Sequence, residues 1–166
     1  MLIIFGGLPA TGKTTIAREL ARQLGATYLR IDTIEQAIRD STTVSQPIHD
    51  EGYRVAYAVA EDNLRLGQTV ISDSVNPIQL SREAWVGVAL RAHARAVEIE
   101  VLCTDPQIHR QRVETRSADM SGLQLPTWEK VISREYEPWE RKHIVIDTAG
   151  RSVAESLQEL REALPK

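Results

Sequence analysis

Short apolar segments alternate along the chain with longer segments in which apolar residues recur at helical spacing. Five segments have the length and composition of strands, at 2–5, 27–31, 69–72, 96–102 and 144–146. Apart from the third, they lack alternation with polar residues, as is typical of strands that are buried on both faces. This order of elements predicts an α/β fold in which helices cover a parallel sheet.

Seven intervening segments have helical character, at 13–24, 33–39, 48–66, 81–93, 105–116, 127–136 and 152–164. In the first of them, Ile16, Leu20 and Leu24 recur every four residues, and Gly25 follows as a stop signal. Residues 117–126 contain Ser, Gly and Leu without helical periodicity, so we expect a loop there.

The composition suits a single domain, which we expect to span residues 1–166. Hydrophobic residues make up 42% of the chain and charged residues 26%, enough for a buried core and a charged surface. The formal net charge of −3 provides no overall basic field to attract nucleic acid. The single cysteine, Cys103, excludes an internal disulfide, and no apolar run approaches the roughly 20 residues that span a bilayer. We therefore expect a cytoplasmic protein without a membrane partner.

The clearest chemical motif is Gly7-Leu8-Pro9-Ala10-Thr11-Gly12-Lys13-Thr14, which fits G-x-x-x-x-G-K-[ST] at every fixed position. It lies between a predicted strand and a predicted helix, as this motif requires. Glycines let backbone N–H groups converge on phosphate oxygens, and the helix N-terminus adds the positive end of its dipole. Lys13 supplies charge for the terminal phosphates, and the Thr14 hydroxyl is a ligand for Mg²⁺. The motif, with the adjacent Thr15, predicts a site for a nucleoside triphosphate.

Two aspartates follow predicted strands. Asp32 lies just past the second strand, at the edge of the sheet where ligands bind in open parallel sheets, so it can face the phosphates. It also precedes the predicted helix 33–39, so a helix N-cap is the alternative role. Asp73 ends the third strand in an arrangement like a Walker B motif, which predicts contact with Mg²⁺, directly or through water. A structural turn is the alternative for Asp73.

Arg112 and Arg116 are four residues apart in a predicted helix and therefore share one of its faces. Two guanidiniums aimed at one point suit the charge that spreads over transferring phosphoryl oxygens, and a planar guanidinium can also stack on adenine. Arg110 lies off that face, where we expect it to be exposed. An ordinary charged surface helix is the alternative interpretation.

The four histidines are scattered, at His49, His93, His109 and His143. They show no pair with the spacing of metal ligands, so we expect surface or incidental roles for them and propose no zinc site. Mg²⁺, held by Thr14 and Asp73, is the metal that the sequence predicts.

With these motifs in place, the chain resembles the P-loop nucleoside and small-molecule kinases, which contain an AAA-type P-loop domain. Within that group it is most similar to the branch with polynucleotide 5′-kinases, chloramphenicol phosphotransferase and zeta toxins. The phosphate loop carries the most specific part of the resemblance, and segments 28–32, 70–82 and 105–116 carry the rest. The resemblance implies a three-layer α/β fold, a five-stranded parallel sheet in the order 2-3-1-4-5, and a helical lid over about residues 106–126.

The resemblance also implies roles for residues outside the loop. Asp32 matches the general base that faces the acceptor hydroxyl, and Asn76 and Arg82 match residues that contact the acceptor. A solvated position on a helix is the alternative for Arg82. Arg112 matches the lid arginine on the adenine side, and Arg116 matches the arginine on the phosphate side.

Two further positions bear on the substrates. The backbone around Thr148 matches the segment that flanks adenine, and the guanine-selective Asn-Lys-x-Asp tetrapeptide of GTPases is absent, so both features favour ATP. Glu35 stands where many relatives carry an arginine that grips the substrate, which weighs against a strongly anionic acceptor.

These features together predict an ATP- and Mg²⁺-dependent phosphotransferase that acts on a hydroxyl group of a small molecule. The Asn76-Pro77 resemblance keeps a polynucleotide 5′-hydroxyl kinase as an alternative, although the acidic composition weighs against long nucleic acid substrates. A nucleotide-binding ATPase switch without an acceptor is the alternative from another class.

Overall fold

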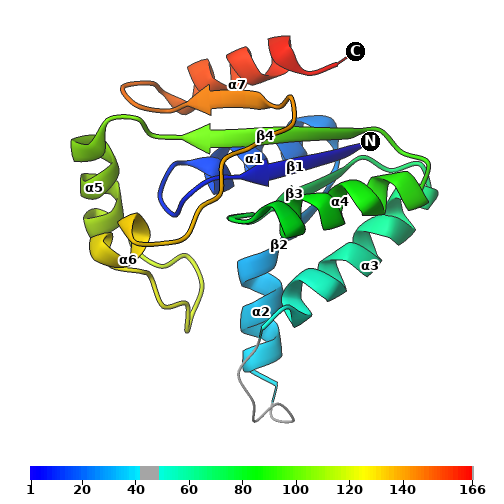
Figure 1. The fold of residues 1–166 in the computed structure, drawn as a ribbon, viewed down its shortest axis with the longest axis horizontal. Coiled ribbons are helices and arrows are strands. Elements are labelled where there is room, and N and C mark those ends of the chain that lie inside the picture. The colour runs from blue at the N-terminus through cyan, green and yellow to red at the C-terminus, as the bar shows by residue number, and fades with distance from the viewer. Residues whose placement is uncertain (42–48, 166) are drawn as a thin grey trace.

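The computed structural model describes residues 1–41 and 49–165, and its centre is a parallel β-sheet (Figure 1). The strands are β1 (Leu2–Gly6), β2 (Thr27–Arg30), β3 (Val70–Asp73), β4 (Ala96–Leu102) and β5 (Ile144–Asp147). They are ordered β2-β3-β1-β4-β5, and every neighbouring pair is parallel. The predicted fold class and the predicted strand order 2-3-1-4-5 are both confirmed.

Helices cover both faces of this sheet and the edge at which its strands end (Figure 1). They are α1 (Lys13–Leu24), α2 (Ile31–Arg39), α3 (Glu51–Arg65), α4 (Gln79–Arg91), α5 (Pro106–Thr115), α6 (Trp128–Ile132) and α7 (Val153–Ala163). The arrowheads of β4 and β5 point toward α5 and α6, which lie beside that edge in Figure 1. In the two described ranges of the chain, no helix has the length and apolar character needed to cross a membrane.

The core lies in two layers, one on each face of the sheet. Successive side chains of a strand point to opposite faces, so Ile3 and Phe5 of β1 pack with α1 and α7, whereas Leu2 and Ile4 pack with α3 and α4. Trp85 of α4 is the largest side chain buried in the second layer. Because both faces of β1 are buried, the strand has no polar alternation, which is why its sequence predicted a central strand.

The elements differ from their predicted bounds by a few residues in most places, and α6 is the main exception. The sequence predicted a helix over 127–136, but α6 ends at Ile132. Beyond it, the Glu137 N–H donates to the Pro77 carbonyl, and the carbonyls of Glu137 and Pro138 accept from the Arg82 guanidinium. These long-range contacts replace the local hydrogen bonds of a helix. The predicted start of α3 at Ile48 lies outside the described residues.

Candidate functional site

The turn between β1 and α1 has a backbone conformation that favours glycine. Gly7 has φ of +140°, and Gly12, the N-cap of α1, has φ of +98°. A Cβ atom on Gly7 would lie 2.3 Å from the Val101 carbonyl oxygen, which belongs to rigid strand backbone. Ala10 also has a positive φ, of +65°. The glycines of the motif therefore allow the backbone to adopt this conformation. The resulting loop forms a concave anion-binding cradle at the N-terminus of α1.

Side chains from distant segments hold this phosphate loop in place. The Thr11 hydroxyl donates to the Leu8 carbonyl at 3.0 Å, and the Thr148 hydroxyl lies 2.7 Å from the Thr11 carbonyl. The buried His109 ring places Nε2 2.8 Å from the Pro9 carbonyl. The expectation of a surface or incidental role is therefore wrong for His109. The signal that identifies it is its position four residues before Val113, on the buried face of α5.

Lys13 and Asp73 lie at the base of the cradle, and both are buried. Burial lowers the pKa of the Lys13 ammonium from its usual value, while the nearby carboxylates of Asp73 and Asp32 raise it. One Asp73 oxygen, Oδ2, accepts a hydrogen bond from the Tyr28 hydroxyl at 2.7 Å. The other oxygen, Oδ1, is buried without a hydrogen-bond partner. A buried carboxylate oxygen with free acceptor capacity suits a hard cation such as Mg²⁺.

The cradle opens into a cavity of about 1320 Å³ at the carboxyl edge of the sheet. The cavity wall includes most of the residues for which the sequence predicted a role, namely Pro9, Ala10, Gly12, Lys13, Thr14, Thr15, Asp32, Arg112, Arg116 and Thr148. Gly7, Leu8, Thr11 and Asp73 belong to the loop and strand end behind this wall. The structure thus brings the phosphate loop, Asp32 and both lid arginines to one space.

Asp32 lies in the first turn of α2 and is half-buried in the cavity wall. The N-cap of α2 is Arg30, and it makes no side-chain cap hydrogen bond. The alternative interpretation of Asp32 as a helix N-cap is therefore wrong. Its Oδ2 lies 3.6 Å from Nη2 of Arg30, so a guanidinium neighbours the carboxylate that the sequence assigned to the acceptor.

The two arginines that the sequence assigned to a lid do not point to one place. Arg112 is held by Thr148, with Nη1 2.7 Å from its hydroxyl and Nη2 2.9 Å from its carbonyl. Arg116 comes just after α5, where the backbone is extended, so it does not continue the helical face of Arg112. Burial lowers the pKa of the Arg116 guanidinium, and Asp32 opposes this shift. Arg112 thus lies on the Thr148 side of the cavity and Arg116 lies on the Asp32 side.

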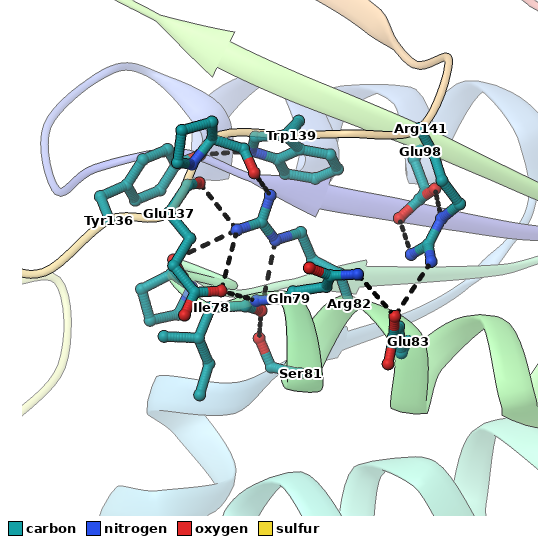
Figure 2. A network of polar contacts seen from close by, with 12 residues as sticks. Ile78, Gln79, Ser81, Arg82, Glu83, Glu98, Tyr136, Glu137, Trp139 and Arg141 are labelled. Carbon is teal, nitrogen blue, oxygen red and sulfur yellow. Dashed lines mark hydrogen bonds and ion pairs between the residues drawn. The ribbon is translucent and has the colours of Figure 1, made fainter.

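The structure does not bring Arg82 and Asn76 to the cavity wall. The Arg82 side chain is buried and donates to backbone carbonyls of Ile78, Pro77, Glu137 and Pro138 (Figure 2). Its Cζ also lies 4.7 Å from the centre of the Trp139 ring, in a cation–π arrangement. Asn76 is fully buried, has φ of +48° and donates from Nδ2 to the Phe5 carbonyl at 2.8 Å. In this structure both residues hold the loop after β3 instead of facing an acceptor.

The sequence did not indicate a cluster formed by Arg18, Arg30 and Asp119 on the cavity wall. Nη1 and Nη2 of Arg30 donate to the two carboxylate oxygens of Asp119 at 2.7 and 3.1 Å. Arg18 donates to the same carboxylate at 2.9 Å. The hydrogen bond from Arg30 is the main cause that lowers the pKa of Asp119 to about 2. Asp119 lies in the loop between α5 and α6, 101 residues from Arg18, so no local pattern could reveal the pairing.

Charge is unevenly distributed around the cavity. The phosphate loop, α1, α5 and the segments that follow α5 contribute most of its cationic side chains. The opposite side, made by α2, the start of α3 and residues 74–84, contributes Asp32, Glu35 and Asp50 together with Tyr53 and Tyr57. Among the described residues that these three segments contribute to the wall, none is Lys or Arg, although Arg30 and Arg116 flank Asp32. One half of the cavity thus suits phosphate, and the other half presents carboxylates, hydroxyls and aromatic rings.

Comparisons with known proteins agree with this geometry. A family model described as "AAA domain" matches residues 2–138 of the chain. An uncharacterized protein of Mycobacterium tuberculosis is 28% identical over 178 aligned positions, which cover 98% of this chain and 35% of that protein. The chain therefore spans about a third of the length of the curated relatives it matches.

Solved structures share the fold along nearly the whole chain. A candidate kinase from Chloroflexus aurantiacus is 24% identical with a TM-score of 0.72, over 99% of this chain and 98% of that one. Kti12 of Chaetomium thermophilum, solved in complex with ADP-AlF3, is 23% identical with a TM-score of 0.70, over 100% of both chains. A gluconokinase from Sinorhizobium meliloti is 16% identical with a TM-score of 0.63, over 95% of this chain and 87% of that one.

Proposed function

The chain belongs to the AAA domain family, and from that premise we propose that it is an ATP- and Mg²⁺-dependent phosphotransferase that acts on a hydroxyl group of a small molecule. The observation that carries this proposal is one cavity in which a phosphate loop faces the carboxylate of Asp32. Its volume of about 1320 Å³ exceeds the roughly 300–1,000 Å³ that is common for a single small ligand. The cavity therefore has room for a nucleotide and an acceptor side by side.

The residues of the nucleotide half fit ATP with Mg²⁺. Backbone N–H groups of loop 7–14 and the Lys13 ammonium would hold the phosphates, and Arg112 and Thr148 would lie on the side of the base. The free Oδ1 of Asp73 and the Thr14 hydroxyl are the oxygen ligands that would hold the cation. The chemistry that Mg²⁺ supplies at such a site is neutralisation of charge on the phosphate oxygens.

Asp32 and Arg116 would act on the transfer itself. The acceptor oxygen forms a bond to the γ-phosphorus, the bond from that phosphorus to the bridging oxygen of ADP breaks, and Asp32 takes the hydroxyl proton. Arg116, on the same side of the cavity, offers a guanidinium to the charge on the transferring oxygens. Both side chains are already beside the space that the acceptor would occupy.

The acceptor half favours a small neutral or cationic molecule. Carboxylates and tyrosines recognise hydroxyl and amine groups, whereas phosphodiesters are held by Lys and Arg. Arg30 and Arg116 flank Asp32, but the described residues that α2, the start of α3 and residues 74–84 contribute to the wall include no Lys or Arg, so these segments give a polynucleotide little to bind. This charge pattern supports a small-molecule acceptor over the polynucleotide alternative.

The test is turnover of MgATP, alone and with a panel of nucleosides, sugars, aminoglycosides and chloramphenicol-like compounds, with products identified by mass spectrometry. We expect one class of compound to stimulate turnover and to be recovered with one added phosphate. Asp32→Asn is expected to lower transfer roughly 100-fold while MgATP still binds, and Lys13→Ala to abolish turnover. Asp40→Asn, an exposed carboxylate at the end of α2, is the matched control. Steady hydrolysis that no acceptor stimulates would support the ATPase switch instead.

A further inference from the structure

Arg30 is a buried cation on the cavity wall whose hydrogen-bonding capacity is only partly used. It is the last residue of β2, and its side chain is 9% exposed. The two Nη atoms contact Asp119 and Nη2 also lies near Asp32, but Nε is buried without a hydrogen-bond partner. A buried guanidinium keeps its charge, so its free donor points to an anionic ligand.

The surroundings of Arg30 identify which anion fits. Across the sheet, Arg30 is the register partner of Asp73, and it lies close enough to Lys13 to lower the pKa of that ammonium. Arg116 is a second neighbouring cation, and its Nε is likewise buried without a partner. Three cations thus gather where the phosphate loop meets Asp32, which is the position of a transferring phosphoryl group.

Asp119 supplies an anion at this place in the present structure. Its two carboxylate oxygens meet the two Nη atoms of Arg30 in a bidentate pair, the geometry that guanidinium also forms with phosphate. Asp119 belongs to the segment between α5 and α6. Arg30, by contrast, is the last residue of strand β2, and its side chain is buried. An incoming phosphoryl group can therefore displace the Asp119 carboxylate and bind the Nη atoms of Arg30 without movement of the arginine.

We propose that Arg30 is a further catalytic residue that binds the transferring γ-phosphoryl group, and that the Asp119 carboxylate occupies this position until the group arrives. The inference rests on the proposed function, since it needs a bound triphosphate. Arg30 then stabilises the negative charge of the transferred oxygens and holds them next to Asp32. Arg18 contacts Asp119 from the exposed side of α1.

The experiment compares variants in which Asp119 no longer competes. MgADP is titrated by calorimetry, alone and with aluminium fluoride as the mimic of the phosphoryl group, into the wild type, D119N, D119N/R30Q and D119N/R18Q. The dissociation constant of MgADP alone, divided by that of MgADP with aluminium fluoride, measures how much the phosphoryl mimic strengthens binding. We expect D119N and D119N/R18Q to keep at least the wild-type ratio. In D119N/R30Q the ratio should fall roughly tenfold or more while MgADP affinity is retained, because a charged hydrogen bond is lost.

The same ratio in D119N/R30Q and D119N would overturn the inference, because Arg30 would then serve only to bind Asp119. If R30Q does not fold, as judged by circular dichroism, D119N/R30K takes its place. Lysine keeps the charge but loses the bidentate geometry, so the ratio should still fall, and an unchanged ratio would again overturn the inference. A wild type that binds no MgADP would instead remove the proposed function, so the two failures are distinguishable.

Discussion

Replacement of Arg82 by methionine measures how strongly one buried side chain holds the loop after β3 to the segment after α6. The Arg82 residue is 2% exposed, and methionine fills much of the same apolar volume without the guanidinium. Its guanidinium donates to carbonyls at distances of 3.2, 3.3, 2.8 and 3.0 Å, namely those of Ile78, Pro77, Glu137 and Pro138.

The magnitude follows from which of these carbonyls have other donors. Ile78 also accepts from the Ser81 hydroxyl, and Pro77 also accepts from the Glu137 N–H, so these two keep a partner. The carbonyls of Glu137 and Pro138 lose the donor that the structure provides, at a cost of about 1–3 kcal/mol each if they stay buried. Loss of the cation–π contact adds about 1 kcal/mol. We expect Arg82→Met to lower the free energy of unfolding by about 3–7 kcal/mol.

Chemical denaturation followed by circular dichroism measures this loss. Arg91→Met is the matched control, because Arg91 lies on the same helix but pairs with Glu61 at the surface, and exposed pairs contribute little. A loss no larger than that of the control would refute the reasoning. Full stability combined with weaker binding of the acceptor would show instead that Arg82 contacts substrate, as the sequence predicted.

Two further perturbations test the phosphate loop and the Asp119 cluster. Gly7→Ala forces a Cβ to within 2.3 Å of the Val101 carbonyl at a φ of +140°, so we expect a loss of about 2–4 kcal/mol in unfolding free energy together with loss of MgADP binding. Gly67→Ala, also at positive φ but in open space, should cost only about 1–2 kcal/mol, and equal losses would contradict the steric argument. The Asp119 pKa is depressed from 3.8 to about 2 in the folded state, so its stabilising effect is present above about pH 4 and is lost as pH falls toward 2. The stability difference between wild type and D119N should therefore shrink below about pH 4, and a difference that stays constant to pH 2.5 would refute this assignment.

The fold was predictable because its signals are local. β1 is apolar at every position but its last, where Gly6 stands, and α1 carries Ile16 and Leu20 at helical spacing. Strand type and helix phase depend on such short patterns, and parallel strands joined by helices leave few topologies. The phosphate loop was predictable for the same reason, since eight consecutive residues fix both its backbone and its chemistry.

The rest of the site depends on contacts between distant segments. Arg30 meets Asp119 across 89 residues, and Arg82 meets Pro138 across 56. Nothing in the sequence around Arg82 distinguishes an arginine that binds substrate from one that binds backbone carbonyls. In both cases the guanidinium lies among polar partners that are distant in the sequence. The sequence could therefore not indicate the carbonyl partners of Arg82, since the partners of a long flexible side chain are set by tertiary packing.

The segment between α5 and α6 is held by contacts on both sides, which limits where the protein can open. On one side, His109 of α5 contacts the Pro9 carbonyl. On the other side, beyond α6, the Trp139 ring packs against Gly6 at the end of β1, where a Cβ atom would lie 2.5 Å from it, and Arg82 stacks on the same ring. Both anchors are buried or packed on backbone, so they cost more to separate than the charged contacts of Asp119. Among these contacts the Asp119 cluster is therefore the one that separates most readily, so we expect movement beside the cavity in the segment between α5 and α6.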